Sequence, residues 1–421
     1  MATWAALLLV VVLVACDDTT LPPPPEGVPQ ISTTQFYSKS STGLPNSDVY
    51  ALLTLSNGEF WIGTEQGIAR YASINVTQRI AGNEGVYNEL NGLPNPKIRD
   101  LAEFNGKVYA ATWGGGFGIY DVASSTWTSI TPATDGADDV QLVAVGSTLN
   151  PGAVVIQAGP NAILETAPRG DDRVSGNRIV DGGNGIAQSQ AWQLDGSIAD
   201  IEISPNEGKV YLATNKDISI YDPATGHFTS FAALTRDVVS TVALRDTPGG
   251  VERWYGPRVE TIEDDPPPPM PPAGITVSRG ASTIYTYTME NSGLPEPNVN
   301  AIFYDADAGS DVFWVATANQ GVSRVTVDTS TWTTYTTVQG LPSNTVYAVT
   351  RAAAPKSGTT IWVATQNGVA RLEADGTWQG YNTGGGLSSD RVRKVYSDDG
   401  QRLWVGYIVD GAAKLNPADA Q

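Results

Sequence analysis

The chain has almost none of the residues that carry metal, thiol or histidine chemistry. Its 421 residues include one cysteine, Cys16, and one histidine, His227. A single cysteine excludes an intramolecular disulfide. One histidine with no other cysteine argues against zinc and copper sites, and a Ser-His-Asp triad would depend on His227 alone. The residues after Asp222, Pro-Ala-Thr-Gly-His, have a turn composition that does not favour a catalytic role for His227.

Basic residues are also few. The chain has 25 Lys and Arg against 44 Asp and Glu, which gives a net charge of −19. This balance argues against a basic nucleic-acid-binding face, and the excess of acid favours solubility. No glycine-rich phosphate loop opens a helix and no Walker pattern occurs, so no cofactor is predicted.

Long apolar runs are absent as well. The longest lies at the start, from Ala5 to Ala15, and its 11 residues are too few to span a bilayer comfortably. It ends in Leu-Val-Ala before Cys16, which resembles the bacterial lipobox. That resemblance implies a signal peptide over residues 1–15 and lipidation of Cys16, although the first four residues lack the usual Lys or Arg. Residues 16–30 contain four consecutive prolines and are predicted to form an extended tether.

What the chain does have is a repeat. The tripeptide Gly-Leu-Pro begins at Gly43, Gly92, Gly293 and Gly340, and a variant, Gly-Leu-Ser, begins at Gly386. Neighbouring copies lie 46 to 49 residues apart, and the long gap in the middle is about four periods. A fixed period of this length indicates a repeat architecture.

Each repeat reads as a four-stranded antiparallel unit. A second marker follows each tripeptide, as in Trp61-Ile62-Gly63-Thr64 and Trp362-Val363-Ala364-Thr365. Large and small residues alternate in it, which is typical of a strand, and the Gly or Ala would let neighbouring sheets approach closely. A glycine and a short apolar run come next, and then a Thr- and Trp-rich segment suited to an edge strand.

Such a sheet cannot bury both faces alone, and radial stacking in a β-propeller solves this problem. The markers also resemble the two-component regulator propeller repeat, closely in four repeats and partly in two more. We therefore predict an all-β chain, with residues 31–421 forming a single β-propeller of about eight four-stranded blades. The repeats begin near residues 43, 92, 137, 196, 236, 293, 340 and 386. Those near 137 and 236 are the weakest, so seven blades remain an alternative.

Two details of the ring follow from the spacing. The last repeat has three strand-like segments and no fourth, whereas residues 34–38 precede the first Gly-Leu-Pro where an outer strand is expected. We expect this N-terminal strand to complete the last blade, which removes an exposed edge. An acidic, proline-rich insertion at residues 259–273 is expected between the second and third strands of its blade, on the face of the Gly-Leu-Pro loops.

The loops after the second strands also share that face. Polar and aromatic side chains around a central concavity suit a sugar or a peptide. The candidate ligand-binding residues on these loops are Glu65, Gln66, Trp113, Asn161, Lys216, Arg258, Asn319, Gln320, Gln366, Asn367 and Tyr407.

A weak calcium candidate lies in one hairpin. Asp305, Asp307 and Asp311 surround a glycine, and hard oxygen ligands in a tight loop can hold calcium. The distal Glu of an EF-hand is missing, and a solvated turn explains the same residues. No catalytic residue is predicted, because the spacing of the many carboxylates selects no pair for glycoside hydrolysis.

Together these features predict a lipid-anchored propeller of the bacterial cell envelope that recognises a glycan, a peptide or an envelope protein. The propeller-repeat resemblance implies a sensor or ligand-recognition module. Two alternatives remain: a propeller-fold enzyme such as a polysaccharide lyase or glycosidase, and a purely structural scaffold. The sequence does not identify the ligand, the membrane leaflet or the oligomeric state.

Overall fold

The structure is a computed structural model that describes residues 29–81, 85–130, 140–144, 154–158, 162–163, 173–175, 178–180, 192–193, 197–214, 218–230, 238–258, 274–280, 282–354, 358–397 and 400–417. For residues 140–193, 227–230, 238 and 258 the description is of the backbone alone. The predicted signal peptide, Cys16 and most of the tether lie outside these ranges.

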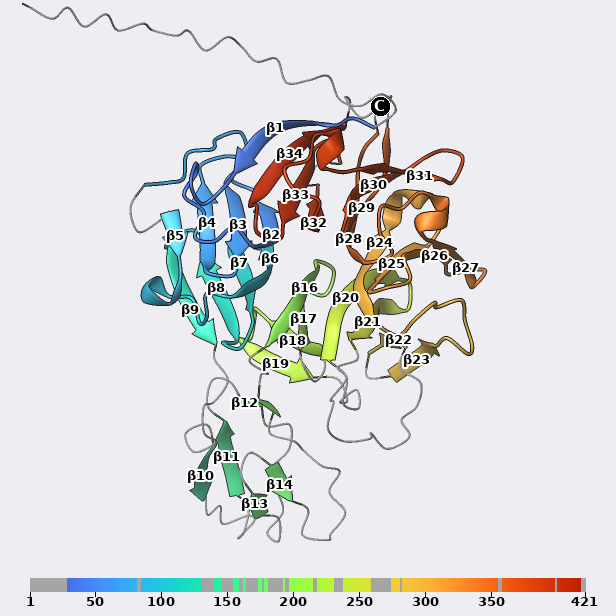
Figure 1. The fold of residues 1–421 in the computed structure, drawn as a ribbon. Helices are drawn as coiled ribbons and strands as arrows, with labels where there is room; N and C mark the ends of the chain where they lie inside the picture. The colour runs from blue at the N-terminus through green and yellow to red at the C-terminus, as the bar shows by residue number, and fades with distance from the viewer. Residues whose placement is uncertain are drawn as a thin grey trace, which may run out of the picture.

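Seven four-stranded antiparallel sheets, the blades, are arranged radially around a common axis in the described part of the chain (Figure 1). In each blade the first strand is innermost and packs against the first strands of both neighbouring blades. The first blade is β2 Val49–Thr54, β3 Phe60–Thr64, β4 Gly67–Tyr71 and β5 Val86–Tyr87; the second is β6 Ile98–Phe104, β7 Lys107–Thr112, β8 Phe117–Asp121 and β9 Thr126–Ile130; and the third is β16 Ile198–Ser204, β17 Lys209–Thr214, β18 Ile218–Asp222 and β19 His227–Ser230. The fourth blade is β20 Val238–Thr247, β21 Gly250–Arg258, β22 Ile275–Arg279 and β23 Ser282–Tyr287, and the fifth is β24 Val299–Asp305, β25 Val312–Thr317, β26 Val322–Thr326 and β27 Thr331–Tyr335. The sixth blade is β28 Val346–Ala353, β29 Thr359–Thr365, β30 Gly368–Leu372 and β31 Trp378–Tyr381, and the last is β32 Val392–Tyr396, β33 Leu403–Tyr407, β34 Ala412–Asn416 and β1 Ser32–Tyr37.

The propeller prediction is therefore confirmed, and the blade count is seven rather than the preferred eight. The repeat expected near residue 137 does not form a blade. Its described strands form only two-stranded pairs: β10 Val140–Ala144 with β11 Val154–Ala158, β12 Ala162–Ile163 with β15 Trp192–Gln193, and β13 Arg173–Ser175 with β14 Arg178–Val180. The blade that ends at β9 packs directly against β16, so this segment is an excursion between the second and third blades.

The N-terminal strand closes the ring, as the spacing predicts. Strand β1 pairs antiparallel with β34 and completes the last blade, with Phe36 opposite Ala413 (Figure 1). Tyr37 is fully buried, and its ring lies against Tyr71 of the first blade and Trp404 of the last. One strand from each end of the chain thus shares a sheet, which joins the two termini of the propeller.

Small residues on the second strands allow the blades to approach one another. A Cβ atom built on Gly63 would lie 2.6 Å from Ile98 Cγ2 of the next blade, and one on Gly406 would lie 2.7 Å from Val49 Cγ1. Such distances are too short for real side chains, so only glycine fits at these positions. Alanines occupy the equivalent place elsewhere, as Ala111 does beside Ile198. The alternation of large and small residues in the sequence is therefore blade-to-blade packing.

Three of the turns that lead into the Gly-Leu-Pro tripeptides, those at Gly92, Gly340 and the variant at Gly386, are built alike. Short 3₁₀ helices, η2 Glu89–Asn91, η4 Thr337–Gln339 and η5 Thr383–Gly385, each end in a left-handed glycine with φ between 103° and 117°. The fourth, η3 Ala306–Ala308, lies in a hairpin instead. Glycine adopts this conformation without the steric cost that a side chain adds. At these three positions the glycine therefore ends a 3₁₀ helix shortly before the next innermost strand begins.

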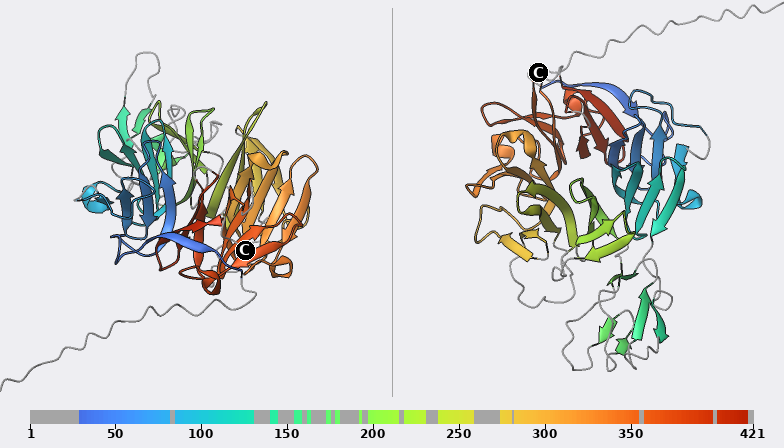
Figure 2. Two further views of the ribbon diagram at one scale, coloured as in Figure 1. Left: turned by 90° about the horizontal axis from the view of Figure 1, so that it is seen from above. Right: turned by 180° about the vertical axis from the view of Figure 1, so that it is seen from behind.

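The acidic insertion at residues 259–273 falls between β21 and β22, the second and third strands of the fourth blade, as expected. Its own residues lie outside the described ranges. Within those ranges, no helix is both long and apolar enough to cross a membrane. Figure 2 shows the ring edge-on in its left view and from behind in its right view, where the sheets again stand around the axis.

Candidate functional site

A β-bulge near the start of every innermost strand directs one residue of each blade into the channel mouth. The pairing of the first two strands shifts register at the same place in all seven blades, as between Val49 and Ala51 or between Ile98 and Asp100. A bulge re-aims a side chain and is common at the rims of barrels and beside active sites. The bulged residues, which we call the mouth ring, are Tyr50, Arg99, Ala199, Ser240, Asn300, Tyr347 and Arg393.

The mouth ring encloses a cavity of about 570 Å³. All seven of its residues line this cavity, and Trp113, Arg391 and Ile408 join them at the rim. The volume lies in the range of small-molecule sites in proteins. The cavity opens on the face of the Gly-Leu-Pro loops, because Trp113 and Ile408 come directly after the second strands β7 and β33.

Tyr50 lies between two arginines from the blades on either side of its own. The guanidinium carbons of Arg99 and Arg393 are each 4.0 Å from the centroid of the Tyr50 ring. Each cation–π contact is worth roughly 0.5–2 kcal/mol. Arg99 also donates to Glu65 at 2.7 Å and lies over the Trp113 ring, while Arg393 reaches Asp48 at 3.3 Å. These contacts hold the planes of both guanidiniums in place before any ligand arrives.

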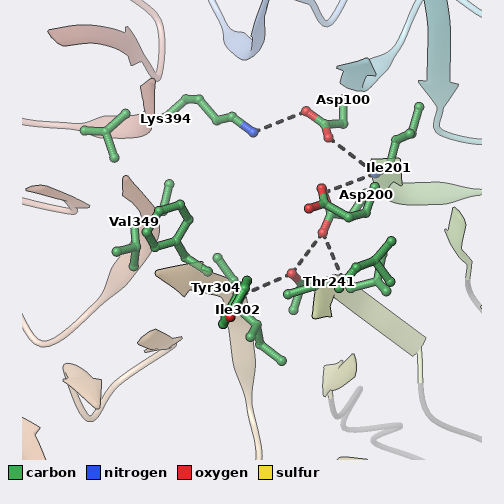
Figure 3. Close-up of a pocket in the computed structure, with 16 residues that line it drawn as sticks. Asp100, Asp200, Ile201, Thr241, Ile302, Tyr304, Val349 and Lys394 are labelled. Carbon is green, nitrogen blue, oxygen red and sulfur yellow. Dashed lines mark hydrogen bonds and ion pairs between the residues drawn. The ribbon is translucent and has the colours of Figure 1, made fainter. Parts of the chain in front are cut away.

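Below the mouth, charged side chains cross the channel. Lys394 of the last blade donates to Asp100 of the second blade at 3.2 Å, although the first blade lies between them in the ring (Figure 3). Asp100 and Lys394 line the mouth cavity and also two deeper cavities of about 250 and 300 Å³. The ion pair therefore lies where the three spaces meet.

A chain of hydrogen bonds links the second, third, fourth and fifth blades at the same level. The Val242 amide and the Thr241 hydroxyl both donate to Asp200 at 2.9 Å, and the Ile302 amide donates to Thr241 at 3.1 Å (Figure 3). The Ile201 amide donates to Asp100 at 3.3 Å. These side chains satisfy amides on the exposed edges of innermost strands, so part of their role is structural.

The channel carboxyls have displaced pKa values. Burial and the neighbouring Asp100 raise the pKa of Asp200 to about 7. Burial, with Asp200 and Asp100 nearby, raises the pKa of Glu202 to about 8. For Lys394, burial favours the neutral amine, but Asp100 and Asp200 outweigh it and raise its pKa. These residues keep some accessible surface because they face the channel, yet protein surrounds them closely enough to penalise the charged carboxylates.

The loop residues expected to bind ligand divide into two groups. Trp113 lines the mouth cavity, and Glu65 supports it through Arg99. Side chains on other loops are exposed and do not line the mouth cavity, namely Gln66, Asn319, Gln320, Gln366 and Asn367. Asn161 and Lys216 lie outside the described residues, and for Arg258 and His227 only the backbone is described.

Tyr407 does not reach the rim. It is fully buried in a hydrophobic cluster with Trp362, Tyr381 and Val392, and burial raises its pKa to about 12. Its place in the repeat explains why. Tyr407 stands at the threonine position of the Trp-Ile-Gly-Thr marker, where Thr64, Thr317 and Thr365 are equally buried. The residue of this loop that lines the cavity is its neighbour Ile408.

The calcium candidates point to arginines of two different blades. Arg351 Nε donates to Asp305 at 2.7 Å, while Arg245 Nη1 donates to Asp311 at 2.6 Å. Asp307 is exposed on the hairpin. Among the described residues, no group of three acidic, His or Cys side chains is placed to hold a metal ion. Two of the three carboxylates therefore serve ion pairs between blades.

The sequence reasoning named none of the seven mouth-ring residues. The signal was present: five of these residues lie seven places after the glycine that begins the tripeptide or its variant, namely Tyr50, Arg99, Asn300, Tyr347 and Arg393. A β-branched residue always precedes them. These residues could be recognised only once the bulge was seen, because in a regular strand with alternating side chains this position would not face the channel axis.

Comparison with known proteins supports the fold. Residues 43–66 match the model of the two component regulator propeller family. A solved structure, the extracellular domain of a hybrid two component system from B. thetaiotaomicron, is similar with a TM-score of 0.57 and 15% sequence identity. The match covers 89% of this chain and 40% of that one, so this chain spans well under half of the larger structure.

A second similar structure is a computationally designed protein, Ika8, with a TM-score of 0.49 and 12% identity. It covers 90% of this chain and 98% of the designed one. The comparison with curated proteins finds no match. These likenesses concern the fold, and the matched repeat is the segment that contains the first Gly-Leu-Pro and the first Trp-Ile-Gly-Thr.

Proposed function

We propose that the chain is a ligand-recognition module whose binding site is the mouth of the propeller channel. The observation that carries this proposal is the mouth cavity of about 570 Å³, lined by side chains that differ from blade to blade. Tyr50, Tyr347 and Trp113 offer aromatic surface, while Ser240 and Asn300 offer polar groups. A concave site with aromatic walls and a few oriented polar groups suits a glycan or a peptide.

We further propose that the module acts outside the cytoplasm, anchored through Cys16. The lipobox-like sequence before Cys16 supports this location, and so does the likeness to an extracellular domain of a two component system. Labelling cells with an alkyne-tagged fatty acid tests the anchor. The wild-type chain should take up the label and Cys16→Ser should not; equal labelling of both would contradict a lipid at this residue.

Ligand recognition is tested by a glycan and peptide array screened with the purified full chain in mild detergent. We expect a defined set of hits that Trp113→Ala weakens strongly and that Trp378→Phe, a conservative change at a buried blade residue, leaves intact. A blank array would favour the scaffold alternative. Hits that are unaffected by Trp113→Ala would place the site elsewhere on the molecule.

The enzyme alternative rests on a different feature, the raised pKa of Glu202. A carboxyl that keeps its proton near pH 7 can serve as a general acid. Glu202 lines both deeper cavities, which are small, about 250 and 300 Å³. Incubating array hits with the protein and analysing the products by mass spectrometry decides the question: cleavage lost in Glu202→Gln supports an enzyme, and intact ligands support a binding module.

A further inference from the structure

The channel mouth carries positive charge in a strongly acidic protein. The chain has a net charge of −19, yet four cationic side chains line the mouth cavity: Arg99, Arg391, Arg393 and Lys394. Two carboxylates line it, and one of them, Asp100, is paired with Lys394. The three arginines stand at the rim, where Arg99 is paired with Glu65 and Arg393 with Asp48, each outside the cavity lining. Three of the four cations, Arg391, Arg393 and Lys394, come from one short segment of the last blade.

Two of these arginines retain unused hydrogen-bonding capacity. The side chain of Arg391 is exposed, and no described residue forms an ion pair with it. Arg393 is stacked on Tyr50 and touches Asp48 with one nitrogen, while its buried Nε donates to no described partner. An unpaired buried donor is costly, so an acceptor supplied by a ligand would be favoured at this point.

Apart from Asp200, whose raised pKa of about 7 leaves it partly protonated at neutral pH, the rest of the mouth is uncharged. The mouth-ring residues of the third to sixth blades are Ala199, Ser240, Asn300 and Tyr347. They give the cavity open space, hydroxyl and amide groups and an aromatic face, with Trp113 on the second blade adjoining the cationic side. A ligand that fits both halves has a neutral polar body with apolar faces and at least one oxyanion. A sugar ring that bears a carboxylate has this pattern.

We propose that the mouth site binds an acidic oligosaccharide and that Arg391 and Arg393 hold its carboxylate. A planar guanidinium pairs with a carboxylate through two parallel hydrogen bonds, which lysine does not offer. The stacking of Arg393 on Tyr50 orients its fork before binding, so little side-chain freedom is lost. This inference rests on the proposed function and names the ligand class for the same site.

The test compares an oligogalacturonate with its methyl ester by calorimetry on the full chain. The two probes have the same sugar rings and differ only in charge. We expect the acid form to bind, the ester to bind at least tenfold more weakly, and affinity for the acid to fall as NaCl is raised. Arg391→Gln combined with Arg393→Gln should lower affinity for the acid form at least tenfold. Lys39→Gln, a charge change at an exposed site outside the mouth, should leave it unchanged.

The other outcomes separate this inference from the proposed function. Equal binding of acid and ester, or array hits confined to neutral glycans, would overturn the inference and leave a recognition module standing. Tighter binding of hexaglutamate than of the sugar acid would assign the site to an acidic peptide and also overturn it. No binding of any probe, together with a blank array, would remove both proposals. Circular dichroism of the double variant confirms that lost binding is not lost folding.

Discussion

Two consecutive residues on each innermost strand behave in opposite ways. The first is Val or Ile in every blade and is at most 1% exposed: Val49, Ile98, Ile198, Val239, Val299, Val346 and Val392. The next is the mouth-ring residue, which is aromatic, cationic, polar or small depending on the blade. The first position is Val or Ile in all seven blades, whereas the position beside it holds five residue types, Tyr, Arg, Ala, Ser and Asn.

The difference arises from what each side chain contacts. The first residue packs against a small residue of the preceding blade, as Ile98 does against Gly63, Val299 against Gly256 and Val49 against Gly406. The second faces the channel, where neighbouring blades impose no common shape. The repeated residues therefore close the ring, and the residues that differ between blades determine the chemistry of the channel mouth. The predictions below address the two positions, beginning with the ring itself.

Removing the closing strand should have the largest effect. Deletion of residues 31–41 takes away β1 and the fully buried Tyr37, and it exposes the edge of β34. We expect the melting temperature to fall by roughly 5–10 °C or more and unfolding to broaden, since Tyr37 alone represents a large-to-small loss of about 3–5 kcal/mol. Differential scanning calorimetry measures this. An unchanged transition would show that the ring is held closed by other contacts.

Next in size is the blade-to-blade contact at the first position. Ile98→Ala should lower the free energy of unfolding by about 2–5 kcal/mol, because Ile98 is fully buried. Gly63→Ala places a methyl group 2.6 Å from Ile98 and should cost about 1–3 kcal/mol. Urea denaturation gives both values.

Combining Gly63→Ala with Ile98→Ala tests directly whether the two residues are in contact. Because the new methyl group and the deleted atoms occupy the same space, the combined cost should be clearly smaller than the sum of the two single costs. Simple additivity would mean that the two blades do not meet at this point as described.

The raised pKa values of the channel carboxyls lead to a third prediction, a pH dependence of the free energy of unfolding. The folded-state pKa of Glu202, about 8, lies above its ordinary value, so the folded protein binds this proton more tightly than the unfolded chain. Stability from this group is present at low pH and is lost as pH rises from about 4.5 to 8, and Asp200 adds to the trend up to about 7. Glu202→Gln should therefore raise the free energy of unfolding at pH 8 by on the order of 1–3 kcal/mol.

The same substitution should change little at pH 5, where the parent is already protonated in the folded state. Urea denaturation of parent and variant at the two pH values measures the difference. If the difference in free energy of unfolding between Glu202→Gln and its parent is the same at pH 5 and pH 8, the raised pKa of Glu202 is contradicted.

The smallest change in stability is expected at an open mouth-ring position. Asn300→Ala removes a hydrogen bond of 2.8 Å to the Val346 carbonyl, which is worth about 0.5–1.5 kcal/mol, and leaves the packing intact. The same denaturation experiment checks this value. A decrease in the free energy of unfolding as large as that for Ile98→Ala would show that the mouth-ring position is as important for stability as the buried residue before it.

The fold could be predicted from the sequence because the same kinds of turn and packing residues recur from repeat to repeat. The helix-ending glycines at 92, 340 and 386, the contact of Gly63 with the next blade and the missing fourth strand of the last repeat each have a direct physical explanation. The sequence left the blade count open between eight and seven because residues near 137 carry apolar segments with the spacing of a repeat, and sequence alone does not show which sheet they join.

The site was harder to find, for two physical reasons. The seven bulges shift the mouth ring off simple alternation, so residues such as Arg393 were not expected to face the axis. The loop residues were selected by face alone, and the depth of each side chain depends on packing that spacing does not reveal. Tyr407 illustrates this, since an aromatic residue at a buried threonine position turns into the core and not toward the rim.

The measurement that tests the central claim most directly pairs neighbouring residues of the last blade, Val392 and Arg393. Array binding and urea denaturation are measured on the full chain for Val392→Ala and Arg393→Gln. The account predicts that Val392→Ala loses stability and keeps its array profile, whereas Arg393→Gln keeps most of its stability and loses the hits. If Arg393→Gln is destabilised as strongly as Val392→Ala while its array profile is unchanged, the mouth ring is part of the scaffold and the account is wrong.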